Sequence, residues 1–532
     1  MISKPKALLS SRWCNLTVRN LPIYVLVAAL CISMWAGHQA SAGVIAPELE
    51  SVMEELGSED EVSVIVYLHE KVNLDSYRLG KKHRRRSRLI KALQRKAHTT
   101  QKPLRTLLRR EETKHVATLW LINSMAVRAR VRVIRKLANH PDVAKVNLDY
   151  TLHLPETRYT AGEQAEWNIN TIGAVQVWDL GFIGQGVVVA SMDTGVDLDH
   201  PDLNLQWRGS TNSWYDAHGE HDSPYDADGH GTHTMGIMVG GDAGGTAIGV
   251  APDANWIAVK IFNDAGEAQF SKIHQGFQWL LDPDGDPNTN DAPDVVNNSW
   301  GLQDRFNECV LEFYNDIQAL KTAGIAVVFA AGNEGPEPNT SISPANYDNG
   351  FAVGSINSSN IVAASSSRGP SPCHLDFFPQ VVAPGVSVKT SDLTSGGAFP
   401  NSYVSVSGTS FAAPHVSGAM ALLMEAFPTL SLAELEDALI LSAEDLGPVG
   451  ADYDYGHGLI NLSATYILLE SSFCSADFNH DESVGLPDLE VLIAEWLRTN
   501  CTNCRSDLNG DQKVDFYDYA EFANHYKQPD YP

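Results

Sequence analysis

The strongest constraint on the fold is a series of short apolar segments that alternate with helix-like patterns between about residues 157 and 465. The segments read GVVVASMD, WIAVKIF, DVVNNSW, IAVVFAAGN and FAVGSI. Apolar strands separated by helices are typical of a parallel sheet that helices cover on both faces. One helix is expected over NECVLEFYNDIQALKTAG (307–324), with Gly324 as its stop. The sequence therefore predicts an α/β domain with a mostly parallel sheet.

Three segments place reactive side chains where a predicted strand gives way to a loop or a helix. Asp193 ends the strand VVVASMD, His230 lies among glycines in DADGHGTHTMG, and Ser410 precedes the apolar helix AMALLMEAF. In an open α/β sheet, the working groups gather at the carboxyl ends of the strands. Acyl transfer needs these residue types, because an imidazole must take the hydroxyl proton and a carboxylate must fix the imidazole tautomer.

Two further histidines lie close to these residues in the sequence. His233 shares a helix face with His230, which leaves a metalloenzyme open, but no H-E-x-x-H signature supplies a third ligand. We therefore expect a structural role for His233. His415 lies about 140° around the helix from Ser410 and is expected to point away from it. Pro414 is expected in or just after the first helical turn, where a missing N–H costs least.

Four blocks of this region, DTGVD, HGTHTMG, AAGNEG and GTSFAAPHV, resemble the subtilisin-like serine proteases, the subtilase family, and occur in that family's order. EWNIN, HGTHTMG and VVNNSWG are most similar to the bacillopeptidase F branch. The resemblance covers about residues 167–465. It implies a serine endopeptidase that acts on peptide substrates through an acyl-enzyme intermediate. It assigns the nucleophile to Ser410, the general base to His230 and the orienting acid to Asp193.

The same resemblance assigns residues around this triad. The side-chain amide of Asn333 is implied to be the oxyanion-hole donor, together with the backbone N–H of Ser410. The segment VNNSWG (296–301) is implied to pair with the substrate backbone. Its last three residues would line the adjoining pocket, namely Ser299, Trp300 and Gly301. Asp202 matches a family calcium ligand without recognisable partner ligands. The oxygen-rich loop DPDGDPNTNDAPD (282–294) is interpreted as a surface insertion, and a calcium site there stays open.

The N-terminus has the layout of a secretory signal peptide. Basic residues precede the apolar run LPIYVLVAALCISMWAG, and the small residues ASA (40–42) follow it. An uncleaved membrane anchor is the alternative, although the run is near the lower length limit for a span. We expect residues 1–42 to be removed and the protein to be secreted, extracellular or bound to the cell surface, with no membrane contact after cleavage.

The formal charge of −27 is unevenly distributed along the chain. Residues 43–156 carry 22 Lys and Arg against 14 Asp and Glu, a net charge of +8, whereas the residues from 157 onward carry 12 against 51, a net charge of −39. This asymmetry favours docking of the first segment on the second. Strand-like and helix-like patterns predict a small α+β unit over 43–156. Its basic stretch has the leucine spacing of a solvated helix, so we expect no nucleic-acid partner.

Given the family resemblance, residues 43–156 are expected to be an inhibitory propeptide that also assists folding. Self-cleavage is expected between about Leu154 and Glu166. The catalytic domain is then expected over 157–465. Five cysteines follow the signal peptide, and their odd number leaves the disulfide pairing open in an oxidising compartment; they are Cys309, Cys373, Cys474, Cys501 and Cys504.

After a linker at 466–473, residues 474–532 form a short acidic segment with two similar loops, DFNHDESVGLPD and DLNGDQKVDFYD. Each loop places oxygen ligands at positions 1, 3 and 5 and a carboxylate at position 12, as in EF-hand-type calcium loops. The pair resembles a dockerin module, which implies a small all-α fold, calcium (Ca2+) and a cohesin-like or cell-surface partner. The expected ligands are Asp477, Asn479, Asp481 and Asp488 in the first loop, and Asp507, Asn509, Asp511, Asp515 and Asp518 in the second.

The second loop is expected to bind calcium more tightly than the first. Glu482 and Gln512 replace the glycine expected at position 6, and Gly485 offers no side-chain ligand at position 9 of the first loop. The alternative function is a catalytically silent subtilase scaffold that acts as a calcium-dependent binding protein.

Overall fold

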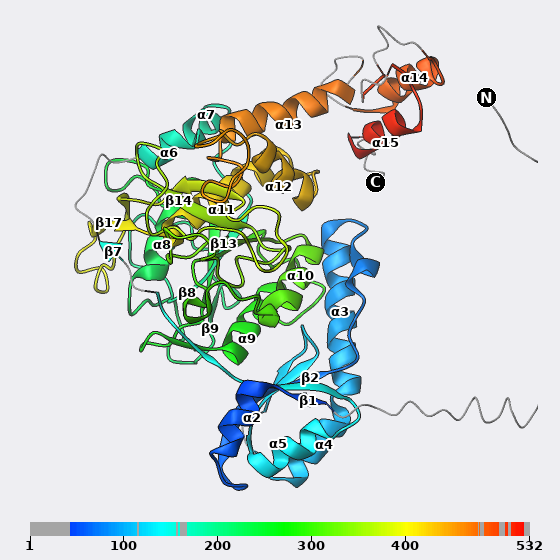
Figure 1. Cartoon of the computed structure of the whole chain (residues 1–532). Coiled ribbons are helices and arrows are strands. Elements are labelled where there is room, and N and C mark those ends of the chain that lie inside the picture. The colour runs from blue at the N-terminus through cyan, green and yellow to red at the C-terminus, as the bar shows by residue number, and fades with distance from the viewer. Residues whose placement is uncertain are drawn as a thin grey trace, which may run out of the picture.

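The computed structural model describes most of the chain after residue 42 (Figure 1). The described residues are 43–113, 116–155, 158–159, 167–476, 478, 484–499, 506–508 and 512–525. The expected signal peptide lies outside this range, as do Cys501 and Cys504. Within the described ranges, every helix is too short or too polar to cross a membrane.

The centre of the molecule is a sheet of seven parallel strands in the order β15-β14-β13-β12-β8-β10-β9. All five apolar segments of the sequence are strands of this sheet, which confirms the predicted parallel α/β fold. The strands are β8 (Val188–Asp193), β9 (Trp214–Asp216), β10 (Asn255–Lys260), β12 (Val295–Asn298), β13 (Ala326–Ala330), β14 (Ala352–Ile356) and β15 (Val381–Pro384).

Successive residues of the central strands point into two different cores. Val295 of β12 packs in one hydrophobic cluster and its neighbour Val296 packs in the other. The first core lies under helices α8 and α11, and the second lies under α9 and α10. Because both faces are covered, β12 to β15 are buried along their whole length, which explains why most of their residues are apolar.

The helices of this region have the following bounds: α6 (Trp167–Thr171), α7 (Ala174–Asp179), α8 (His230–Val239), α9 (Phe270–Leu281), α10 (Tyr314–Ala323), α11 (Thr409–Ala426), α12 (Leu432–Leu441) and α13 (Leu462–Ala476). The expected start of one helix was wrong. Helix α10 begins at Tyr314 rather than at 307, because Asn307 has a left-handed backbone (φ 57°) and Cys309 is joined by a disulfide to Cys373. Its end is as predicted, since Gly324 closes it with φ 80°.

Residues 43–155, called the leader below, contain a five-stranded mixed sheet in the order β1-β5-β2-β4-β3. Its strands are β1 (Val44–Ile45), β2 (Glu61–Leu68), β3 (Val116–Leu119), β4 (Ser124–Arg130) and β5 (Val143–Leu148). Its helices are α2 (Pro47–Glu54), α3 (Lys82–Thr100), α4 (Lys102–Arg110) and α5 (Val131–Ala138). Figure 1 shows this sheet at one end of the molecule, with α3 alongside α10.

The leader shares a hydrophobic core with the central domain. Leu89 and Leu93 of α3 pack in the same cluster as Ile317 and Leu320 of α10. The basic stretch of the sequence is therefore a docked helix, with its apolar face against the central domain.

Two small antiparallel sheets also connect the end of the leader, and the residues just after it, with the central domain. Strand β6 (Thr151–His153) pairs with β11 (Glu267–Gln269). Strand β7 (Arg158–Tyr159) pairs with β17 (Tyr403–Ser407), which pairs in turn with β16 (Val388–Ser391). At the other end of the chain, α14 (Leu486–Glu495) and α15 (Phe516–His525) follow α13.

Candidate active site

The structure brings Asp193 and His230 together in a buried hydrogen bond. Asp193 is the last residue of β8, and His230 is the first residue of α8. His230 Nδ1 lies 2.7 Å from Asp193 Oδ1, and neither side chain is more than 2% exposed. A carboxylate on Nδ1 fixes the imidazole tautomer in which Nε2 is free to accept a proton.

Two opposing effects set the protonation of His230. Burial disfavours the imidazolium, but the negative charge and hydrogen bond of Asp193 outweigh it, so the pKa of His230 lies above its ordinary value. The pair is therefore arranged to hold the positive charge that a general base acquires.

Ser410 is the second residue of α11, and its side chain is buried. Gly408 precedes the helix with φ 151° and ψ 166°, so the chain turns sharply into α11 at this point. Ser410 Oγ donates a hydrogen bond of 3.3 Å to the carbonyl of Ser299. The ring of Phe411, the next residue, lies 5.5 Å from the His230 ring, so the start of α11 is adjacent to the Asp193–His230 pair.

Asn333 follows β13 and faces the same helix start. Its Oδ1 accepts hydrogen bonds from the backbone N–H of Thr409 at 3.0 Å and from the Thr409 hydroxyl at 3.1 Å. Because the amide oxygen is held on the residue before Ser410, the amide N–H groups point away from Thr409. This is the orientation that an oxyanion donor beside Ser410 requires.

The three expected pocket residues have different surroundings in the structure. Ser299 is buried and donates from Oγ to the Ser410 carbonyl at 2.7 Å. The indole of Trp300 lies in the core beside the rings of Phe313 and Phe329, and not in a pocket. Gly301 packs so closely that an added Cβ would lie 2.4 Å from Ile342 Cδ1.

The bond from Ser299 explains how α11 tolerates Pro414. Pro414 is inside the helix, at the sixth residue of α11, and so falls just after the first turn, as expected. It has no N–H to donate to the carbonyl of Ser410, four residues earlier. The Ser299 hydroxyl satisfies that carbonyl instead.

The other histidines have partners elsewhere. His233 Nε2 lies 3.0 Å from Asp392 Oδ1. His415 bonds through Nδ1 to the Phe411 carbonyl at 2.8 Å and through Nε2 to the Asn168 side chain at 2.9 Å. Burial lowers the pKa of His415 to about 4, so this ring is neutral. The geometry of His415 therefore agrees with the expectation that it is not the base for Ser410.

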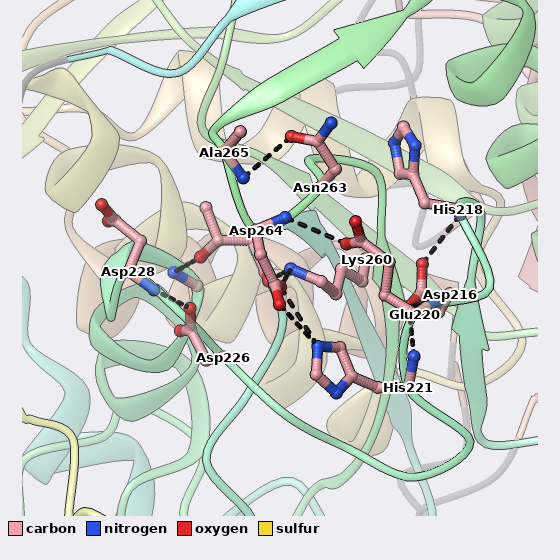
Figure 2. A network of polar contacts seen from close by, with 12 residues as sticks. Asp216, His218, Glu220, His221, Asp226, Asp228, Lys260, Asn263, Asp264 and Ala265 are labelled. Atoms are coloured by element: carbon pink, nitrogen blue, oxygen red, sulfur yellow. Dashed lines mark hydrogen bonds and ion pairs between the residues drawn. The ribbon is translucent and has the colours of Figure 1, made fainter.

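Polar residues that sequence reasoning missed hold the triad segments in place (Figure 2). Asp226 accepts the backbone N–H groups of Gly229 and Thr232, both at 2.9 Å, and so fixes the start of α8. Lys260 is fully buried, donates to the Thr194 carbonyl at 2.9 Å and pairs with Asp264 at 3.1 Å. A lysine inside the apolar segment WIAVKIF was the available signal for this role.

The end of the leader lies against this site. Leu154 N donates to the Gly266 carbonyl at 2.9 Å, which continues the β6–β11 pairing. A cavity of about 540 Å³ lies here, lined by His153, Leu154 and Pro155 of the leader and, among others, by Thr194, Asp228 and Asp264. Arg158 pairs with Ser407, three residues before Ser410. The described chain therefore pairs with the central domain both before and after residues 156 and 157.

Asp202, the residue matched to a family calcium ligand, is engaged in hydrogen bonds. One carboxylate oxygen accepts the N–H of Ala243 at 2.7 Å, and the other accepts the Tyr403 hydroxyl at 2.6 Å. It belongs to neither of the two groups of potential metal ligands found among the described residues.

These features define a subtilisin-like serine endopeptidase, and the chain belongs to the subtilase family, whose family model matches residues 184–458. The chain is 35% identical over 417 residues to bacillopeptidase F of Bacillus subtilis (strain 168), which covers 71% of this chain and 28% of that protein. It is 34% identical over 353 residues to subtilisin E of the same organism, covering 64% of this chain and 80% of the relative. Subtilisin of Bacillus pumilus is 35% identical over 312 residues, covering 57% and 98%. The chain thus spans less than a third of bacillopeptidase F.

Proposed function

We propose that this protein is a secreted serine endopeptidase, made as a zymogen that cleaves its own leader. Ser410 is the nucleophile, His230 is the general base and Asp193 orients the imidazole. The observation that carries this assignment is the buried 2.7 Å contact between His230 and Asp193, next to the start of the helix that holds Ser410. Secretion is supported by the signal-like N-terminus and by the Cys309–Cys373 disulfide.

The chemistry follows from these positions. Ser410 Oγ attacks the peptide carbonyl while His230 Nε2 takes the hydroxyl proton. The oxyanion that forms is stabilised by the Asn333 amide and the backbone N–H of Ser410. His230 then gives its proton to the leaving amine, and the acyl-enzyme remains on Ser410. A water molecule, deprotonated by His230, hydrolyses this ester and restores the serine.

Peptide substrates are proposed to bind as an added strand. Two segments of the described chain already pair in this way, since β6 of the leader pairs antiparallel with β11, and β7, just after the leader, pairs antiparallel with β17. Main-chain hydrogen bonds of this kind accept many side-chain sequences. The backbone of 299–301 would face the other edge of the bound peptide.

The same path supports a position for self-cleavage. Pro155 lines the cavity beside Thr194 and Asp228, Arg158 begins β7, and residues 156 and 157 between them lie outside the described ranges. We place the scissile bond between Pro155 and Arg158, inside the interval expected from the sequence. The leader would then comprise residues 43–156, and the catalytic domain would begin near 157.

The leader is proposed to remain bound as an inhibitor after cleavage, because helix α3 has its own docking site away from the triad. The guanidinium of Arg86 is buried and donates to the carbonyls of Ala292, Pro293 and Ala323 at 3.2, 2.9 and 3.1 Å. Lys82 pairs with Asp294 at 2.5 Å. Basic residues of the leader therefore make specific contacts with carbonyl groups and a carboxylate of the central domain.

Replacing Arg86 with methionine is expected to speed release of the cleaved leader by about 30-fold or more. Removing one partner of a buried, hydrogen-bonded charge costs about 2–5 kcal/mol and acts mainly on dissociation. The measurement is the delay between leader cleavage, followed on gels, and the appearance of protease activity. Arg84→Met on the exposed side of the same helix is the control. An unchanged delay in R86M would show that α3 contributes little to inhibition.

Replacing Asn333 with alanine is expected to lower kcat by about a hundred- to a thousand-fold with little change in KM, because an oxyanion donor acts only in the transition state. Steady-state kinetics on a peptide substrate test this. A change in KM alone would instead assign Asn333 to substrate binding.

The C-terminal segment is proposed to be a dockerin-like module that binds Ca2+. Its two loop–helix units bury equivalent positions: Val484 and Val514 near the loop ends, and Leu492 and Phe522 in α14 and α15. The position-12 carboxylates, Asp488 and Asp518, are fully buried as well.

Buried carboxylates at two equivalent positions are what paired calcium loops provide. Asp488 accepts the N–H of Gly485, and Asp518 accepts those of Leu508 and Asp515, each at 2.8 Å. The described ligands also include Asp507 and Asp515. The others lie outside the described residues, namely Asp477, Asn479, Asp481, Asn509 and Asp511. A cohesin-like or cell-surface partner is proposed for this module.

Calcium titration of the full chain tests the module. In a Ser410→Ala background, which removes self-cleavage, Asp518→Asn is expected to abolish at least one calcium equivalent measured by calorimetry. Glu490→Gln in the exposed part of α14 is the control. Equal stoichiometry in all three proteins would refute calcium binding by the second loop.

Labelling with a fluorophosphonate probe tests the catalytic assignment as a whole. Ser410 is expected to be labelled in the mature protein, and the label is expected to disappear in His230→Ala. N-terminal sequencing of the mature form locates the cleaved bond. An intact serine that resists the probe would instead favour the silent scaffold with a calcium-dependent binding role.

A further inference from the structure

The loop between α9 and β12 gathers three carboxylates that neither the triad nor the tail uses. One oxygen each of Asp282, Asp284 and Asp291 lies within 4.8 Å of the other two. All three residues belong to the central domain, so the group persists when the leader is removed. Three negative charges at this separation repel one another unless a cation lies between them.

The decisive member of the group is Asp282. Its side chain is 7% exposed, and its Oδ2 accepts a hydrogen bond of 2.9 Å from Gln94 of the leader. Its Oδ1 is buried and has no hydrogen-bond partner within the described part of the chain. A buried carboxylate oxygen without a donor is costly, because it has lost its water and gained nothing in return.

The loop orients the other two carboxylates through one oxygen each. Asp284 Oδ1 accepts the N–H of Asp286 at 2.8 Å, whereas Asp291 Oδ2 accepts the N–H of Asp284 at 2.9 Å and the amide of Asn212 at 3.0 Å. The second oxygen of each has at most a long contact: Asp291 Oδ1 lies 3.3 Å from the Thr289 hydroxyl. Each carboxylate therefore has an oxygen that a cation can take.

Nearby basic side chains compensate this group only in part, since Arg208 attracts Asp291 and Asp284 without forming an ion pair with either carboxylate. Arg208 donates to the backbone carbonyl of Asp291, and Lys91 donates to Asn288. No Lys, Arg or His of the described ranges forms an ion pair with any of the three carboxylates.

A second group of potential ligands, Glu220, His221 and Asp264, provides the contrast (Figure 2). There the Asp264 carboxylate has partners within the protein, since it lies 2.9 Å from His221 Nε2 and forms an ion pair of 3.1 Å with Lys260 Nζ. Its Asp264 carboxylate is already compensated, so that group needs no metal ion.

We propose that Asp282, Asp284 and Asp291 bind a calcium ion in the catalytic domain. An all-oxygen set selects a hard cation, and an irregular loop with a mixture of buried and exposed ligands suits Ca2+ better than Mg2+, which demands near-octahedral geometry. Water molecules would complete the coordination on the exposed side, where Asp284 lies. The buried Oδ1 of Asp282 thereby gains the partner that it lacks.

The test compares two neighbouring exposed aspartates of the same loop, Asp284 and Asp286, in full-length Ser410→Ala protein. Calcium is removed with a chelator and titrated back by calorimetry. Asp284→Asn is expected to bind one calcium equivalent fewer than the parent protein, or to bind that equivalent at least tenfold more weakly. Asp286→Asn is expected to retain it, because Asp286 is not part of the group.

The buried ligand supplies a second readout that does not depend on stoichiometry. Asp282→Asn is expected to raise Tm in chelator, because an unpaired buried charge is removed, and to reduce the further rise of Tm on adding Ca2+. Equal binding by the parent and D284N proteins, or an undiminished calcium response in D282N, would overturn the proposal. Because Ser410 is replaced throughout, neither result depends on protease activity.

Discussion

Replacing Ser410 with alanine is expected to lower kcat by about a million-fold and to leave the leader attached to the chain. The loss of the nucleophile removes the acyl-enzyme route. The contribution that the three triad residues make together to kcat is therefore lost with this single change. The residual rate over water would come from the oxyanion site and substrate positioning. Kinetics on a peptide substrate measure the first effect, and the mass of the purified protein measures the second.

Ser417→Ala is the matched control for this experiment. Ser417 lies on the same helix and bonds to the Asn297 side chain at 3.1 Å, away from the Asp193–His230 pair. Its replacement is expected to change kcat by less than about tenfold, since it removes one hydrogen bond of about 1 kcal/mol. Leader removal in pure S410A protein would contradict self-cleavage, because processing would then need another nucleophile.

Replacing Asp193 with asparagine is expected to lower kcat by about ten-thousand-fold while the fold is preserved. The amide can no longer stabilise the imidazolium, and it allows the wrong tautomer of His230. The kinetics of a slow peptide substrate, with refolded or trans-processed protein, measure this loss.

The pH profile gives the same experiment a second readout. Catalysis needs neutral His230, and the Asp193 carboxylate raises the pKa of this ring above its ordinary value. Activity of the parent protein should therefore rise with pH through a midpoint above about 6.5. In D193N that midpoint should move to lower pH, because the raising charge is gone and burial still lowers the pKa. Asp199→Asn, an exposed neighbour, should leave the midpoint in place.

The positions of the triad residues followed from local sequence. Asp193 terminates an apolar strand and His230 begins a helix after Gly229, which has φ 103°. These are properties of short segments, so the motifs predicted them. The parallel sheet also followed, because strands covered on both faces are mostly apolar and do not alternate with polar residues.

Other features depended on contacts between segments far apart in the chain. Trp300 directly follows Ser299, yet its indole packs against Phe313 and Phe329 in the core. The start of α10 was wrong because one left-handed asparagine interrupts a sequence with helical spacing. The Ser299 hydroxyl donates to the Ser410 carbonyl that Pro414 leaves without a partner, and these two serines are 111 positions apart in the sequence.

By itself, the sequence determined the class of fold, the residues proposed for catalysis and the charge difference between residues 43–156 and the residues that follow, since strand patterns, motifs and charges are local properties. Only the tertiary structure decided which strands of the central domain pair with β6 and β7, which leader arginine is buried, and which aspartate of the 282–294 loop lacks a donor. The reason is physical: burial and hydrogen-bond satisfaction are set by what other segments bring to a residue, and no local pattern contains that information.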